Sequence, residues 1–165
     1  MPFSYCSIRE KFHNLTDQPS DAQDWEAVIS IGTAARMLSL SVSALRKYEK
    51  EGLLVYHRTQ TGRRLLCRAD VNRVKMIQHM VNDLGLNMEG IRRLLALLPC
   101  WELMPCSEID RRNCIAMRDP IHPCWMTRKT ECAKKGLNCR ECDVYRNAAY
   151  ATPVIKALLF EVDDK

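Results

Sequence analysis

The chain has 165 residues, of which 47% are hydrophobic and 27% are charged, and its formal net charge is +5. This length and composition suit one folded domain with a smaller appendage, and they exclude a wholly disordered chain. The apolar runs are too short for a membrane span and the first residues lack a secretory signal, so we expect a cytoplasmic protein. Thiols stay reduced in the cytoplasm, where clustered cysteines more often bind metal than form disulfides.

The positive charge is concentrated in residues 29–98, which hold twelve Lys and Arg against five Asp and Glu. A basic block of this kind favours a polyanionic partner, usually nucleic acid, with an ordinary solvated surface as the alternative. The preceding segment, 1–28, is acidic, contains Pro2 and Pro19, and shows no lasting period. We therefore predict a flexible leader followed by a basic domain.

The first part of the basic block predicts two short helices. Gly32 and Thr33 offer a start for a helix over AARMLSL. Ser41 can cap a second helix over VSALRKYEKEGLL, and Gly52 follows its last turn, where a glycine is expected. Two short helices joined by a tight turn form a helix-turn-helix motif.

A β-hairpin is predicted to follow the second helix. One strand covers residues 54–58, Thr61 and Gly62 mark the turn, and a second strand returns over 64–67. A hairpin directly after a helix-turn-helix is a wing, so these segments together predict a winged helix-turn-helix.

Two more helices complete the predicted domain. The first begins at Asp70 and ends at Gly85, and the second is capped by Asn87 and stopped by Pro99. Apolar side chains recur in both every three or four residues, which is typical of helices that pack on a core.

Over residues 29–96 the sequence resembles the DNA-binding domain of the MerR family of bacterial transcription regulators. The resemblance is carried by ISIGTAARMLSLSVSALRKYEKEGLL, the basic hairpin, and ADVNRVKMIQHMVNDLGLNMEGIRRLL. It implies a winged helix-turn-helix and homodimers that bind pseudo-palindromic double-stranded promoter DNA and affect RNA polymerase indirectly, through the twist of that DNA. The sequence departs from the family pattern at Arg63 and Leu66, where the wing usually has aromatic residues, and at Ala44, which replaces the usual threonine.

Eight residues are predicted to contact DNA. Ser41 and Ser43 stand at the start of the second helix, where short side chains reach base edges, and Arg46 follows one turn on. The resemblance gives the Tyr48 hydroxyl a phosphate contact, with a core tyrosine as the alternative. Arginines on the wing can reach flanking phosphates, and Lys47 is a weaker candidate. The full set is Ser41, Ser43, Arg46, Lys47, Tyr48, Arg58, Arg63 and Arg64.

Seven of the nine cysteines lie in one segment that is poor in aliphatic residues and begins at Cys100. Such a segment buries little apolar surface, so we expect metal ligation to stabilise it. Only the last two form a CxxC pair, and the other ligands would come from separate loops. Cys6 and Cys67 are excluded from the ligand set, Cys67 because it is expected to pack on the wing. The predicted ligands are Cys100, Cys106, Cys114, Cys124, Cys132, Cys139 and Cys142.

The layout CWELMPC, PCW and NCRECDVY resembles the two-CW type of cysteine module over residues 100–145. Its position behind a DNA-binding domain suggests a sensor of redox state or metal. An iron–sulfur cluster is the favoured cofactor, because all-thiolate ligation suits a cluster and oxidants destroy clusters readily. Zinc and a metal-free thiol–disulfide switch are the alternatives. For the whole protein the alternatives are a DNA-binding protein with a purely structural zinc site and, less favoured, a thiol redox enzyme; we expect no enzyme.

The sequence as a whole predicts a mainly α fold. A leader over 1–28 precedes the winged helix-turn-helix of 29–98, which is followed by a small irregular cysteine-rich module over 99–145 and a tail over 146–165 with a short helix. No long heptad pattern follows Pro99, so a homodimer contact would have to use the cysteine module or the tail.

Overall fold

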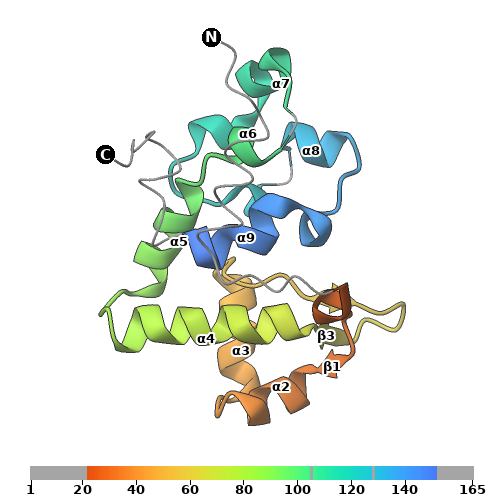
Figure 1. Cartoon of the computed structure of the whole chain (residues 1–165), viewed down its shortest axis with the longest axis vertical. Coiled ribbons are helices and arrows are strands. Elements are labelled where there is room, and N and C mark those ends of the chain that lie inside the picture. Colours follow the sequence, from red (N-terminus) through yellow and green to blue (C-terminus); the bar gives the residue numbers. More distant parts are fainter. Residues whose placement is uncertain (1–21, 105, 128, 152–165) are drawn as a thin grey trace, which may run out of the picture. The chain divides into compact units, whose positions relative to one another are not determined.

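The computed structural model describes residues 22–104, 106–127 and 129–151; most of the predicted leader, with Cys6, lies outside these ranges. The chain divides into two compact units, with the division between Arg92 and Arg93. Figure 1 shows the chain with its α-helices and the strands β1 and β3 labelled. Within the described ranges, no helix is long and apolar enough to cross a membrane.

The two helices of the predicted helix-turn-helix are α2 (Ile31–Met37) and α3 (Val42–Lys50), which pack against each other (Figure 1). Ser41 caps α3 as predicted, because its Oγ accepts a hydrogen bond from the backbone N–H of Ala44 at 3.0 Å. The predicted start of the first helix, at Ala34, was wrong by three residues. Ser30 caps it instead, and its Oγ accepts from the backbone N–H of Thr33 at 3.1 Å.

The wing is the antiparallel pair β2 (His57–Arg58) and β3 (Arg64–Leu66), in which Arg58 lies opposite Arg64. Gly62 in the turn has a φ of 77°, a conformation that favours glycine. A third strand, β1 (Ile29–Ser30), pairs with the other edge of β3 and gives the order β1-β3-β2. The sequence did not predict β1, since two residues are too short to show a period.

Two longer helices, α4 (Arg68–Asn82) and α5 (Met88–Ala96), follow the wing. The helix α4 begins two residues before its predicted start at Asp70, because the Asp70 carboxylate reaches back to accept from the backbone N–H of Cys67 at 2.9 Å. Asn87 caps α5 as predicted, accepting from the backbone N–H of Gly90 at 2.7 Å. The core of this unit is made of fully buried side chains that include Leu45, Leu53, Leu66, Val74, Ile77 and Ile91.

The described part of the predicted leader is not extended throughout. Residues Ala22–Trp25 form a 3₁₀ turn, η1, that lies against α4. Part of α4 in the basic domain is therefore covered by a segment that the sequence assigned to the leader.

The cysteine-rich unit is built from short helices, and the mainly α fold class is confirmed. Three of the short elements have a side-chain N-terminal cap: Ser107 caps α7, Thr130 caps α8 and Asn138 caps η4. Prolines and Gly136 separate the elements, which keeps each of them to a turn or two. The elements are α6 (Cys100–Leu103), α7 (Glu108–Asn113), η2 (Ile115–Arg118), η3 (Cys124–Met126), α8 (Glu131–Lys134), η4 (Cys139–Glu141) and α9 (Asp143–Ala151).

The helix α9 crosses the predicted boundary between module and tail at residue 145. Val144, Tyr145 and Ala148 on this helix are buried, and α9 packs against α6 and η4. The first part of the predicted tail therefore belongs to the core of the cysteine-rich unit, while residues 152–165 lie outside the described ranges.

Candidate nucleic-acid interface and metal centre

The N-terminal half of α3 presents polar and cationic side chains to solvent. Ser41, Ser43, Arg46 and Lys47 are all exposed. The two serine hydroxyls lie 2.8 Å apart, so they share a hydrogen bond next to the start of the helix. This surface has the composition expected of a helix that enters the major groove.

Tyr48 belongs to the core more than to the surface. Its side chain is only 6% exposed, and burial raises the pKa of its phenol. The ring packs inside the domain, and the predicted phosphate contact of its hydroxyl stays a prediction.

Glu49 connects α3 to the wing. Its Oε1 accepts from Arg58 Nη2 at 2.6 Å, and its Oε2 accepts from Arg64 Nε at 2.8 Å. The Arg64 guanidinium also lies over the Tyr56 ring, 5.9 Å from its centroid, in cation–π geometry. One carboxylate thus holds two of the three predicted wing arginines, while Arg63 is exposed.

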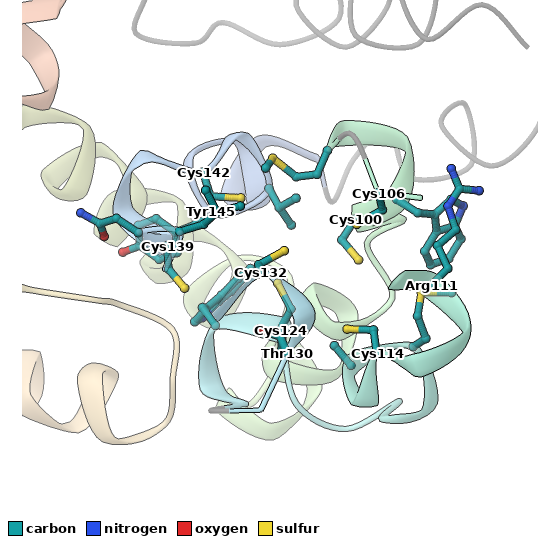
Figure 2. Close-up of a pocket in the computed structure, with 18 residues that line it drawn as sticks. Cys100, Cys106, Arg111, Cys114, Cys124, Thr130, Cys132, Cys139, Cys142 and Tyr145 are labelled. Atoms are coloured by element: carbon teal, nitrogen blue, oxygen red, sulfur yellow. The ribbon is translucent and has the colours of Figure 1, made fainter. Parts of the chain in front are cut away.

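All seven cysteines of the predicted ligand set line one cavity of about 40 Å³ (Figure 2). Each comes from a different place in the chain: Cys100 from α6, Cys132 from α8 and Cys139 from η4, with the others in or beside neighbouring turns. Figure 2 shows the sulfurs of Cys100, Cys124 and Cys132 pointing into the same space. The structure therefore brings together the whole set that the sequence singled out.

The wall between the sulfurs is mostly apolar. Trp125 and Tyr145 stack edge to face at 5.3 Å between ring centroids, and Trp101 lines the cavity as well. Aromatic side chains of this size exclude water from the sulfurs, which lowers the local dielectric.

Partial burial raises the pKa of five of the cavity thiols, which favours their neutral form when no metal is bound. Burial, with a smaller effect of Cys106, raises the pKa of Cys100 to about 12 and that of Cys132 to about 11. The pKa values of Cys124, Cys139 and Cys142 are raised as well, again first by burial. A metal that binds here must displace protons, as it does in other thiolate sites.

The seven thiols are suitable ligands for a thiophilic metal or cluster. Their sulfurs are not pre-arranged around a single ion, however. Among the described residues, no three His, Cys, Asp or Glu side chains stand close enough to hold one ion. A zinc ion bound by four thiolates needs sulfurs about 4 Å apart, since each Zn–S bond is about 2.3 Å long.

His122 pairs with Asp119 at 3.0 Å and does not line the cavity. Arg111 is the one charged side chain among the described residues that line it. Cys67 is fully buried in the other unit, where its thiol donates to Asp70 at 3.2 Å, a packing role in line with its exclusion from the predicted ligands.

Sequence reasoning missed two residues that the geometry singles out, Glu49 and Arg111. A signal existed for each. Glu49 is acidic on a helix whose neighbouring charges, at Arg46, Lys47 and Lys50, are basic. Arg111 precedes Cys114 by three residues, which places both on one face of a helical turn.

Comparison with known proteins agrees with the fold of the first unit. Residues 29–98 match the family described as MerR HTH family regulatory protein. The HTH-type transcriptional regulator ZntR of Escherichia coli (strain K12) is 35% identical over 79 residues, which cover 47% of this chain and 55% of that protein. The putative heat shock protein HspR of Streptomyces coelicolor is 32% identical over 80 residues, 48% of this chain and 52% of that protein.

The fold and these matches agree on the architecture of the first unit. A helix-turn-helix followed by a paired wing is a winged helix-turn-helix, the architecture of a DNA-binding domain. Residues 29–98 are similar to the MerR type of this architecture, since the family match runs from β1 through α5. The chain spans about half the length of the curated relatives it matches.

Proposed function

We propose that this protein is a DNA-binding transcription regulator whose cysteine-rich unit holds a thiolate-ligated metal centre and responds to redox state or metal. The MerR-type domain and the name of one relative, a transcriptional regulator, support the first half. The cavity lined by seven cysteines supports the proposed metal centre. Neither half calls for enzymatic activity.

In this proposal α3 enters the major groove, with the wing beside it. Ser41, Ser43 and Arg46 face base edges and nearby phosphates, and the wing arginines reach phosphates that flank the groove. Two copies bind a pseudo-palindromic promoter and influence RNA polymerase through the shape of that DNA. The exposed cations of α3 and the wing support this arrangement.

An iron–sulfur cluster is the favoured occupant of the cavity. The all-sulfur donor set suits it, because clusters are held by cysteine thiolates. When bound, a cluster supplies an oxidant-sensitive redox centre. Cys100 is the fourth residue after α5 ends, so a change in ligation at Cys100 acts close in the chain to the DNA-binding unit.

A structural zinc site is the second candidate. The cysteine-rich unit consists of short capped elements with few buried aliphatic side chains, which is typical of domains that need a metal to fold. In that case the metal stabilises the unit, and DNA affinity does not depend on oxidants.

The test begins with protein purified without air. Iron, acid-labile sulfide and zinc are measured, and a DNA duplex is selected by the protein from a random library. Iron with sulfide, and affinity for the selected duplex that changes on mild oxidation, supports the cluster sensor. One zinc and affinity indifferent to oxidation supports the structural site, while failure to select any duplex rejects the DNA-binding proposal.

A further inference from the structure

Arg111 stands out among the residues that line the cysteine cavity. It belongs to α7, and it is the one charged side chain among the described lining residues (Figure 2). Its Nε is buried and has no hydrogen-bond partner among the described residues. A buried cationic N–H without an acceptor is unfavourable in a protein interior.

A metal centre with thiolate ligands would supply the missing acceptor. Four thiolates outnumber the charges of Zn²⁺, and a cluster held by four thiolates is also an anion, so both carry net negative charge. Hydrogen bonds to the sulfurs and nearby charge tune the affinity and the reduction potential of such centres. Among the described residues that line the cavity, no other side chain offers the centre a charge of opposite sign.

We propose that Arg111 donates its Nε–H to a sulfur of the bound centre and offsets part of its negative charge. This inference rests on the proposed metal centre and applies to a cluster or to zinc. Arg111 is not a ligand in this role; it acts on the centre through a cysteine sulfur or, in a cluster, through a bridging sulfide.

The chain provides a matched control in the next residue. Arg112 is on the same helix and carries the same charge, but its side chain is 75% exposed and pairs with Glu108. Arg112→Gln removes one cation from α7 without touching the cavity. Arg111→Gln removes the guanidinium beside the sulfurs, and Arg111→Lys keeps the charge while removing the Nε–H.

The experiment measures metal affinity by chelator competition on full-length protein purified without air. Arg111→Gln should weaken binding roughly 10- to 100-fold, the usual effect of losing a partner of a metal ligand. Arg111→Lys should fall between Arg111→Gln and wild type, and Arg112→Gln should match wild type. If the centre is a cluster, its midpoint potential should also fall in Arg111→Gln, because an added electron loses a stabilising cation.

Thermal unfolding separates this role from simple packing. Metal-free Arg111→Gln should unfold at or above the wild-type temperature, because it no longer buries an unpaired N–H, whereas the metal-bound variant should unfold below wild type. If Arg111→Gln lowers the unfolding temperature equally with and without metal, the inference is overturned. It is also overturned if Arg111→Gln binds metal as tightly as the wild type does. A wild-type protein that takes up no iron or zinc would reject the metal centre itself and Arg111's role with it.

Discussion

Glu49 is an acidic residue on α3, the helix that is proposed to bind the polyanion DNA. Its two carboxylate oxygens hold Arg58 and Arg64 of the wing, at 2.6 and 2.8 Å. Exposed ion pairs add only about 0–1 kcal/mol to stability, so the main effect of Glu49 is to fix where the two guanidinium groups point. A positioned guanidinium loses less entropy when it meets a phosphate.

Glu49→Gln therefore has opposite effects on two kinds of DNA. Affinity for random duplex should rise slightly, because one negative charge is gone from the interface. Affinity for the selected duplex should fall roughly fivefold, about 1 kcal/mol, because the wing arginines are no longer held. Gel-shift titration measures both. Glu51→Gln is the control, since Glu51 pairs with Arg92 rather than with the wing. Equal gains on both duplexes would show that Glu49 only repels DNA.

Arg46 tests the placement of α3. Arg46→Ala should weaken binding to both duplexes and reduce the slope of log affinity against log salt by about 1 if a phosphate contact is lost. Stability should stay within about 0.5 kcal/mol, because the side chain is exposed. Lys75→Ala, at an exposed position on α4, is the control. Wild-type affinity and salt slope in Arg46→Ala would remove α3 from the interface.

Among the helices and strands, capping residues determined which helix starts could be predicted from the sequence. Ser41 and Asn87 mark helix starts by chemistry that acts over three residues, so α3 and α5 could be placed from sequence. The strand β1 and the double ion pair of Glu49 depend on packing between distant segments, which no local pattern encodes. Seven cysteines predicted metal ligation, but their convergence on one cavity required the fold of the whole unit.

A polar link joins two short elements of the cysteine-rich unit. Lys135 Nζ, just after α8, donates to Asp110 Oδ2 on α7 at 2.6 Å. Hydrogen bonds from Lys135 and then Ser107 lower the pKa of Asp110 to about 2. Because the folded-state pKa is lower than the ordinary value of 3.8, the link stabilises the fold above that pH. Its contribution is lost as pH falls towards 2.

Asp110→Asn should therefore lower the unfolding temperature at neutral pH and have little effect at pH 2. Thermal unfolding of the variant and the wild type, measured by circular dichroism across this range, checks the prediction. Glu108→Gln, which removes an exposed carboxylate on the same helix, serves as the control. A difference between Asp110→Asn and wild type that persists undiminished to pH 2 would contradict the assigned ionisation.

At the scale of the molecule, the two units draw their stability from different sources. The MerR-type unit has a core of fully buried aliphatic side chains, including Leu45 and Ile77. The cysteine-rich unit has a smaller apolar core around Leu103, Val144 and Tyr145, next to the sulfur-lined cavity. We expect the second unit to depend on metal more than the first.

Metal removal should therefore reduce the hydrogen-exchange protection of the cysteine-rich unit and leave that of the MerR-type unit unchanged. Hydrogen exchange on the full chain, with and without a strong chelator under anaerobic conditions, should show lost protection over residues 100–151 and retained protection in α4. Re-addition of the metal found in the purified protein should restore the pattern. Equal loss of protection in both units, or no loss in either, would show that metal does not stabilise the cysteine-rich unit selectively.

The number of sulfurs around the cavity has a consequence for experiments that identify ligands. A tetrahedral site or a cubane uses four cysteines, so seven around one cavity leave three as substitutes. A Cys→Ser scan of single positions will understate the true ligands, because a neighbouring thiol can take over a vacated coordination position. Double replacements, chosen from opposite walls of the cavity, overcome this redundancy.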